Sequence, residues 1–196
     1  MIKKLLTITL AFVLLSSLKV LSIEPDIFVQ STVNRASKLL SENISKEEKV
    51  KQLKIIAKET VDIKGIGLYT LGAKRKNLSS EQKNKYSELF EAYFLKSFSS
   101  RLAEYTNPEI DVFDKEKLNE NYTIVNSTLK GTKDRPEIKI DWRIYTKDPS
   151  NPLIRDLIIE GLSLARTQKE EFASVLNSND GDINALFKTL IEFSKN

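Results

Sequence analysis

The middle of the chain contains two stretches in which apolar and charged residues alternate. In segment 138–144, isoleucine or tryptophan occupies every second position, with a charged residue between each pair. A period of two is typical of a strand that buries one face. Segment 147–152 contains two prolines and predicts a turn. Beyond it the alternation resumes, interrupted at Arg155, with three apolar residues on the inner face: Leu153, Leu157 and Ile159. Together the two stretches predict a β-hairpin.

Helical periodicity lies on both sides of this hairpin. Apolar residues recur at spacings of three and four, which places them on one face of a helix. The segments with this pattern are 25–42, 45–57, 62–72, 79–106, 163–176 and 183–193. Segment 62–72 contains two early glycines and makes a poor isolated helix, so tertiary packing must hold it.

The order of these elements predicts the fold class. A short strand is expected at 110–113 and another at 122–130, ahead of the hairpin. Gly161 is expected to end the hairpin, and Ser163 to cap the helix that follows. Helices come first, strands form one block, and helices follow. We therefore predict an α+β fold with an antiparallel sheet of about four strands and the helices on one side.

The longest predicted helix carries a stripe of aromatic residues. It starts at a capping box, with Ser79 as the cap and Gln82 three residues later. The stripe consists of Tyr86, Phe90, Tyr93, Phe94, Phe98 and Tyr105. Such a stripe belongs either to a packed core or to the wall of an apolar cavity, and helical spacing alone does not decide between them.

The amino terminus has the composition of a leader. Residues 1–22 combine a basic start, an apolar run that is too short to span a membrane, and small residues before a cut expected after about Ser22. We predict a cleavable signal peptide at 1–22 and a single domain at 23–196, with about 170 residues for one core. Export without any cysteine means that packing alone must stabilise the domain.

Charge and motifs exclude several classes of function. The chain has 31 basic and 27 acidic residues, and three of the lysines lie in the leader, so the rest is close to neutral. The sequence has neither a concentrated basic stripe nor a recognition motif, so we do not expect nucleic-acid binding. The absence of histidine and cysteine removes most catalytic triads and transition-metal sites. Neither a phosphate-binding loop nor a nucleophile elbow is present, so we expect no cofactor, metal or catalytic residue.

An ordered set of short motifs carries a resemblance. It runs from Asp62…Tyr69-Thr-Leu-Gly72 through Ser79-Ser-Glu-Gln82 and the aromatic helix, then Ile140-x-Trp142-Arg143-Ile144, and then Asp156-Leu-x-Ile-Glu160-Gly161-Leu-Ser163-Leu and Phe172. This set resembles the MlaC (toluene-tolerance) family over most of residues 25–193. The resemblance implies a periplasmic, non-enzymatic carrier of phospholipid with an apolar cavity between sheet and helices. It implies two partners: an outer-membrane lipoprotein–porin complex and an inner-membrane ABC transporter with an MCE domain.

The resemblance also implies where lipid binds. The expected cavity walls are Phe90, Phe94, Phe98, Leu129, Ile140, Trp142, Ile144, Leu157 and Ile159, with Ile66 and Leu71 closing one end. The basic cluster Lys74, Arg75 and Lys76, expected on a loop, is a candidate contact for anionic headgroups or for an acidic partner.

Three alternatives stay open on the sequence. In the first, the ligand is another apolar molecule, such as a hopanoid or an aromatic solvent. In the second, the cavity belongs to an isomerase-like or dehydratase-like enzyme. In the third, the domain has a filled core and no ligand. The enzyme requires a titratable group, Asp141 or Asp156, inside an apolar pocket with a raised pKa. We expect Asp156 instead to form an ion pair with Arg143 across the hairpin.

Overall fold

The structure is a computed structural model that describes residues 22–133 and 135–195. The predicted leader lies outside the described residues except for Ser22. The helices before the sheet are α1 (Pro25–Ser41), α2 (Lys46–Thr60), α3 (Ile63–Thr70), the 3₁₀ turn η1 (Gly72–Lys76) and α4 (Ser80–Leu102). The strands are β1 (Ile110–Asn119), β2 (Tyr122–Leu129), β3 (Ile138–Tyr145), β4 (Leu153–Ile159) and β5 (Leu162–Ser163), and α5 (Leu164–Asn177) and α6 (Ile183–Lys195) follow.

The strands form one antiparallel sheet in which each strand pairs with the next along the chain. The predicted fold class and hairpin are confirmed, and the fifth strand is only the two residues Leu162–Ser163. The prediction of a short first strand was wrong, because β1 continues to Asn119. Its second half is charged and exposed, so no apolar alternation reveals it. Charged side chains on an edge strand discourage pairing with other chains.

The buried face of the sheet follows the predicted alternation in β3. Ile140, Trp142 and Ile144 are buried, and Val125 and Leu129 of β2 join them. Lys139 is exposed on the other face. This face therefore supplies the sheet side of the core.

The register of β4 differs from the expected alternation at one residue. Arg143 lies opposite Asp156, but the next residue, Ile144, lies opposite Ile154, so Arg155 has no partner in β3. This is a β-bulge, in which one extra residue shifts the alternation along the strand. Ile154 is therefore buried, whereas Leu153 was wrongly predicted to lie on the inner face.

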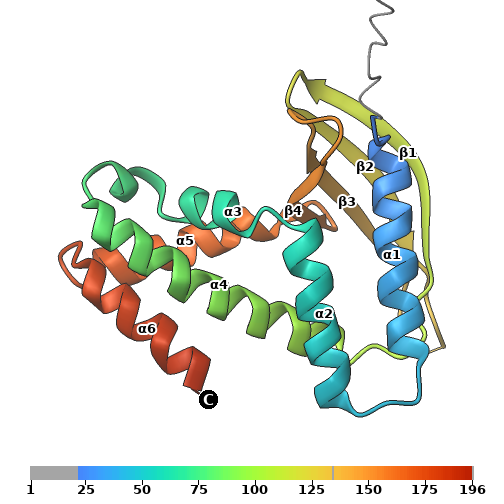
Figure 1. Cartoon of the computed structure of the whole chain (residues 1–196), viewed down its shortest axis with the longest axis horizontal. Coiled ribbons are helices and arrows are strands. Elements are labelled where there is room, and N and C mark those ends of the chain that lie inside the picture. The colour runs from blue at the N-terminus through green and yellow to red at the C-terminus, as the bar shows by residue number, and fades with distance from the viewer. Residues whose placement is uncertain (1–21, 134, 196) are drawn as a thin grey trace, which may run out of the picture.

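Figure 1 shows the sheet at one end of the molecule and most of the helices extending away from it. α1 packs along β1 and β2, and α2 packs between α1 and α4. α4 runs outward from α2, with α3 and α6 against it, and α5 connects β4 to α6. Within residues 22–133 and 135–195, no helix combines the length and apolar character needed to cross a membrane.

The helix starts confirm the sequence signals. The Ser79 side chain accepts a hydrogen bond from the Gln82 backbone N–H while the Gln82 side chain accepts one from the Ser79 N–H, which completes the predicted capping box of α4. Ser163 caps α5 as expected. α4 ends at Leu102, four residues before the predicted end.

Helix α3 lies unusually close to α4, and its second glycine permits this. Gly67 is buried, and a β-carbon built on it would lie 2.8 Å from the Phe90 ring. Phe90 in turn stacks with Tyr86 and meets the edge of Phe172 from α5. The Tyr86 hydroxyl and the Thr70 hydroxyl share a hydrogen bond of 2.8 Å. These contacts explain how tertiary packing holds a glycine-containing helix.

Gly67→Ala is expected to lower the free energy of unfolding by about 1–3 kcal/mol, because the new methyl group overlaps the Phe90 ring. Without such an overlap, alanine stabilises a helix by about 0.5–1 kcal/mol relative to glycine. The sign of the change in the free energy of unfolding therefore distinguishes overlap from helix propensity. Denaturant unfolding measures it, with the exposed α3 substitution Lys64→Ala as control. Unchanged or increased stability of Gly67→Ala would contradict the close packing.

Candidate functional site

An apolar cavity of about 410 Å³ lies between the buried face of β3 and β4 and the helices α3, α4 and α5. This volume is in the range of small-molecule sites in proteins. The apolar and aromatic lining residues are Val61, Ile66, Phe90, Tyr93, Phe94, Phe98, Leu102, Tyr105, Trp142, Ile154, Leu157, Ile159, Leu164 and Ala165. Helix α4 contributes the largest share, since the C-terminal half of its aromatic stripe faces this space.

The structure brings most of the predicted wall residues together. Those that line the cavity are Ile66, Phe90, Phe94, Phe98, Trp142, Leu157 and Ile159. Those that do not are Leu71, Leu129, Ile140 and Ile144, all of which are buried in the surrounding core. The alternation of a strand identifies its inner face but not which inner residues meet a helix and which face open space. For that reason the sequence did not separate wall from core.

Trp142 presents an apolar surface to the cavity because its polar atom is bound inside the sheet. The indole Nε1–H donates to Ser127 Oγ at 2.8 Å, and Ser127 Oγ donates to the Ile140 carbonyl at 3.0 Å. A buried indole N–H normally requires such a partner. Ser127 is itself fully buried, so the hydrogen bond between the indole N–H and Ser127 Oγ is shielded from solvent.

Asp156 lines the cavity, but every hydrogen bond on its carboxylate serves the fold. One oxygen accepts from the Ala165 backbone N–H at 3.0 Å, and the other accepts from Ser163 Oγ at 2.6 Å and from Arg143 Nη1 at 3.2 Å. The predicted ion pair with Arg143 is therefore confirmed. Asp141 is not part of the lining and accepts a hydrogen bond from Asn126 at 2.8 Å. Both carboxylates act as structural acceptors.

Tyr93 is a lining residue whose hydroxyl group has a raised pKa. Burial raises the pKa of Tyr93, the nearby Glu171 carboxylate raises it further, and the Gln168 hydrogen bond and Arg101 act in the opposite direction. The hydroxyl donates to Gln168 Oε1 at 2.7 Å. Tyr93 thus stays neutral near pH 7 and serves as a hydrogen-bond donor rather than a base.

The polar lining residues gather along the facing sides of α4 and α5. They are Ser97, Arg101, Thr167, Gln168 and Glu171, in addition to Asp156. Three lining residues are exposed to solvent, Arg101, Leu164 and Glu171. The cavity therefore opens to the surface between these two helices. The sequence reasoning missed this rim, although Leu164, Gln168 and Glu171 share the spacing of one helix face.

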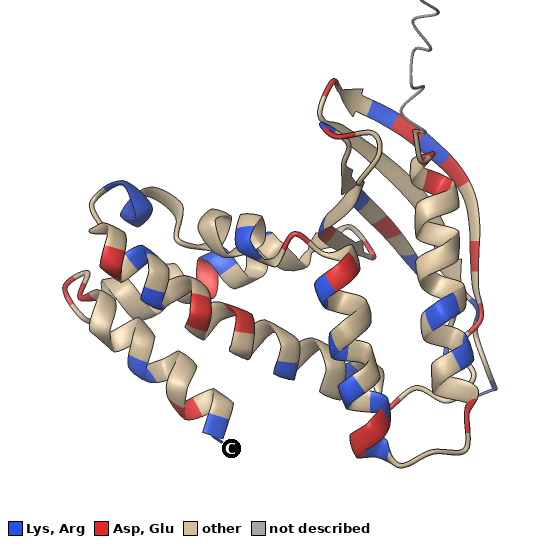
Figure 2. Cartoon of the chain, viewed as in Figure 1, with Lys and Arg blue, Asp and Glu red and all other residues tan. Residues whose placement is uncertain are grey.

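The basic cluster at Lys74, Arg75 and Lys76 lies away from the cavity. The prediction that it lies on a loop was wrong, because the three residues belong to the 3₁₀ turn η1. None of them lines the cavity. Figure 2 shows this basic turn beside the N-terminal end of α4, whereas the cavity follows the C-terminal half of that helix. Lys74 also lies close to Gly181 in the α5–α6 turn. The structure thus separates the cluster from any ligand in the cavity.

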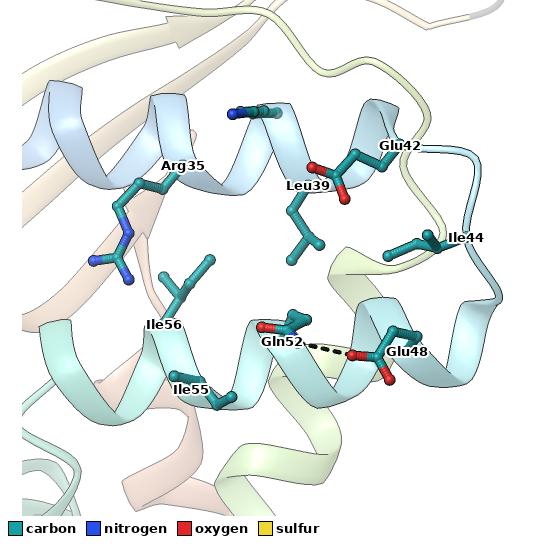
Figure 3. A pocket seen from close by; sticks show the side chains of 9 residues that line it. Arg35, Leu39, Glu42, Ile44, Glu48, Gln52, Ile55 and Ile56 are labelled. Carbon is teal, nitrogen blue, oxygen red and sulfur yellow. Dashed lines mark hydrogen bonds between the residues drawn. The ribbon is translucent and has the colours of Figure 1, made fainter.

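A second hollow of about 500 Å³ lies between α1 and α2 (Figure 3). Its walls are Arg35, Lys38, Leu39, Glu42, Ile44, Glu48, Gln52, Ile55 and Ile56, and Gln52 donates to Glu48 at 2.7 Å. Charged and amide side chains make up more than half of this lining, so it does not suit an apolar ligand. Among the described residues, no group of three or more histidine, cysteine or acidic side chains is placed to hold a metal ion.

The sheet and helices of this α+β domain enclose an apolar cavity with a polar rim. This arrangement is typical of a protein that binds an apolar ligand. The particular family follows from the comparison with family models: the model described as "MlaC protein" matches residues 30–192, and the chain belongs to this family. The resemblance identified from the sequence is thereby confirmed.

A solved structure shares this fold. It is described as the phospholipid-binding protein from Ralstonia solanacearum in complex with a phospholipid. The two folds superimpose with a TM-score of 0.74 at 18% sequence identity, over 88% of this chain and 98% of that one. The search of curated proteins gives no match.

Ser127→Ala is expected to destabilise the protein by about 1–3 kcal/mol, because it leaves the buried Trp142 indole N–H without an acceptor. Trp142 is the only tryptophan of the chain, so its fluorescence reports the changed environment as well as unfolding. Thr128→Ala, one residue along the strand and on the other face, is the control. Equal stability of the two variants would show that the hydrogen bond to Ser127 contributes nothing.

Proposed function

We propose that this protein is a periplasmic carrier that binds a phospholipid by its acyl chains and moves it between the inner and outer membranes. The observation that carries the proposal is the apolar cavity between the sheet and helices α4 and α5. The family and the fold shared with a phospholipid-binding protein support it. The predicted leader supports the periplasmic location.

The energetics of lipid in water explain why a cavity of this kind is needed. A diacyl lipid has about 30 methylene groups, and each costs about 0.8 kcal/mol to expose to water. Exposing both chains therefore costs on the order of 24 kcal/mol, which makes unassisted transfer extremely slow. A carrier lowers this cost by replacing water with apolar side chains, and it requires neither a catalytic residue nor a nucleotide site.

The size of the cavity is compatible with acyl chains. Its volume of about 410 Å³ is within the range of small-molecule sites in proteins, and it opens to the surface between α4 and α5.

The bonding of Asp156 argues for a carrier over a cavity enzyme. A proton-transfer enzyme needs a titratable group that is free to exchange a proton with substrate. Asp156 is held by Ser163, Ala165 and Arg143, and Tyr93 is held neutral. The partners that we propose, an inner-membrane ABC transporter with an MCE domain and an outer-membrane lipoprotein–porin complex, follow from the resemblance of the sequence to this family.

Trp142→Asp is expected to abolish lipid retention, because it places a charge on the cavity floor. Leu157→Asp, on the neighbouring strand, is expected to do the same, and Ile158→Asp is the matched control because Ile158 is similarly half-buried but does not line the cavity. Native mass spectrometry and lipid extraction of protein from a membrane-containing host measure the result. About one phospholipid per chain is expected for the unmodified protein and for Ile158→Asp. Protein that carries no lipid and takes none up from vesicles would refute the proposed function.

Charge reversal of Lys74, Arg75 and Lys76 to Glu is expected to slow lipid transfer to acceptor membranes without reducing bound lipid. The reason is that this cluster lies outside the cavity but on the surface, where it attracts anionic membranes or an acidic partner. Reversal at three dispersed exposed lysines, Lys51, Lys133 and Lys188, controls for net charge. Transfer rates with labelled lipid distinguish the two sets. Equal slowing by both sets would remove any specific role for the cluster.

A further inference from the structure

The rim of the cavity carries two opposite charges that form no ion pair among the described residues. Arg101 comes from the last turn of α4 and Glu171 from the middle of α5, and both are exposed residues of the cavity lining. Asp156 is the other charged lining residue, and Arg143 and the start of α5 already neutralise it. The rim therefore presents one cation and one anion, neither of them in a described ion pair, to a ligand that extends out of the cavity.

The guanidinium of Arg101 is available to a ligand. Among the described residues, no hydrogen bond or ion pair from its side chain to another side chain is present, Glu171 included. An arginine fork has five donors and matches the oxygens of a phosphate group. Ser97, one helical turn earlier on α4, lies in the same lining and adds a hydroxyl group.

Glu171 is held in place and keeps one carboxylate oxygen without a described partner. Tyr93 donates to Gln168 Oε1 at 2.7 Å, and Gln168 Nε2 donates to Glu171 Oε2 at 2.9 Å. This chain of hydrogen bonds runs from the cavity wall to the rim and fixes the direction of the carboxylate. Both Arg101 and Glu171 line the same cavity as Tyr93 and act electrostatically on its hydroxyl group, so both charges lie near this part of the wall.

We propose that Arg101 and Glu171 form a headgroup site that selects a zwitterionic lipid, with the phosphate at Arg101 and the ammonium group at Glu171. This inference rests on the proposed function, since acyl chains in the cavity bring the headgroup to the rim. A net anionic headgroup with no amine, such as phosphoglycerol, gains the contact with Arg101 but meets the uncompensated carboxylate of Glu171. A phosphoethanolamine headgroup satisfies both charges.

The test is a competition between two lipids with identical acyl chains. Delipidated protein is incubated with vesicles of equal parts phosphatidylethanolamine and phosphatidylglycerol, and native mass spectrometry gives both the total lipid per chain and the ratio of headgroups. Exposed charge contacts contribute up to about 1 kcal/mol, which corresponds to an enrichment of about fivefold for phosphatidylethanolamine. Raising the salt concentration is expected to reduce the enrichment, because it screens exposed charges, while leaving total lipid unchanged.

Matched variants separate the rim charges from general surface charge. Glu171→Gln is expected to remove most of the enrichment, whereas Glu170→Gln, the exposed neighbour outside the lining, keeps it. Arg101→Gln is expected to weaken retention of both headgroups, whereas Arg166→Gln, exposed on α5 and outside the lining, leaves it unchanged. All four positions are exposed, so the variants are expected to fold, and circular dichroism verifies this.

The outcomes are distinct. Lipid bound in the proportion of the vesicles, or an enrichment that Glu171→Gln does not alter, overturns the headgroup site while leaving the carrier function intact. An absence of bound lipid in every variant overturns the proposed function and this inference with it. Soluble glycerophosphoethanolamine at the same concentration as the lipid is expected to compete poorly, since the acyl chains supply most of the affinity. Effective competition by it would contradict a lipid headgroup site.

Discussion

The β-bulge at Arg155 is the local feature on which the placement of the helices against the sheet depends. Because Arg155 has no partner in β3, its side chain is free to reach Asp62 at the start of α3, with Nε 2.6 Å from the carboxylate, and to lie over the Tyr145 ring. The next residue, Asp156, holds the first turn of α5 through Ala165 N–H. Two consecutive residues of one strand thus fix the starts of two helices.

The cavity follows from where these helices are fixed. α3 and α5 begin at β4, and α4 docks on α3 where Gly67 lets it approach, with Phe90 packed against Phe172 of α5. The three helices support one another around that aromatic cluster, so they do not collapse onto the remaining sheet surface. Among the described side chains, no buried polar atom lacks a hydrogen-bond partner. Most of the lining is aromatic or aliphatic, so the interior of the cavity offers water few hydrogen-bond partners and favours an apolar ligand.

The sequence predicted those parts of the structure that depend on local pattern. Alternation in β3, the capping box at Ser79 and the glycine after β4 each specify a local conformation, and the hairpin, the start of α4 and the cap of α5 followed from them. The bulge at Arg155 was not predictable in the same way, since an interruption by one charged residue fits either a bulge or an exposed position. The charged half of β1 shows no alternation of apolar and polar residues, because this part of the edge strand is exposed and buries neither face.

The candidate site was predictable only in part, for a different reason. Phe94 and Phe98 were expected in the wall because the family resemblance implies a cavity beside the aromatic helix, whose pattern alone fits a core or a wall. Ile140 and Ile144 have the same chemistry and the same alternation as Trp142, yet they belong to the packed core. Whether an inner residue meets a neighbour or open space is decided by the three-dimensional path of the helices. The rim was missed because Arg101 and Glu171 belong to helix faces that look solvated when each helix is considered alone.

The division of the site into an apolar interior and a charged rim suits a carrier in a way that a fully enclosed pocket would not. Affinity that comes from methylene groups is non-directional and nearly independent of headgroup, so it retains any lipid about equally. Selection must then come from directional groups at the opening, where Arg101 and Glu171 lie. Exposed charges contribute little free energy compared with an acyl chain, so the proposed headgroup site biases which lipid binds without preventing its release. In the proposed carrier, the opening between α4 and α5 keeps the bound lipid in reach of an acceptor, because an acceptor offers the acyl chains an apolar environment of the same kind.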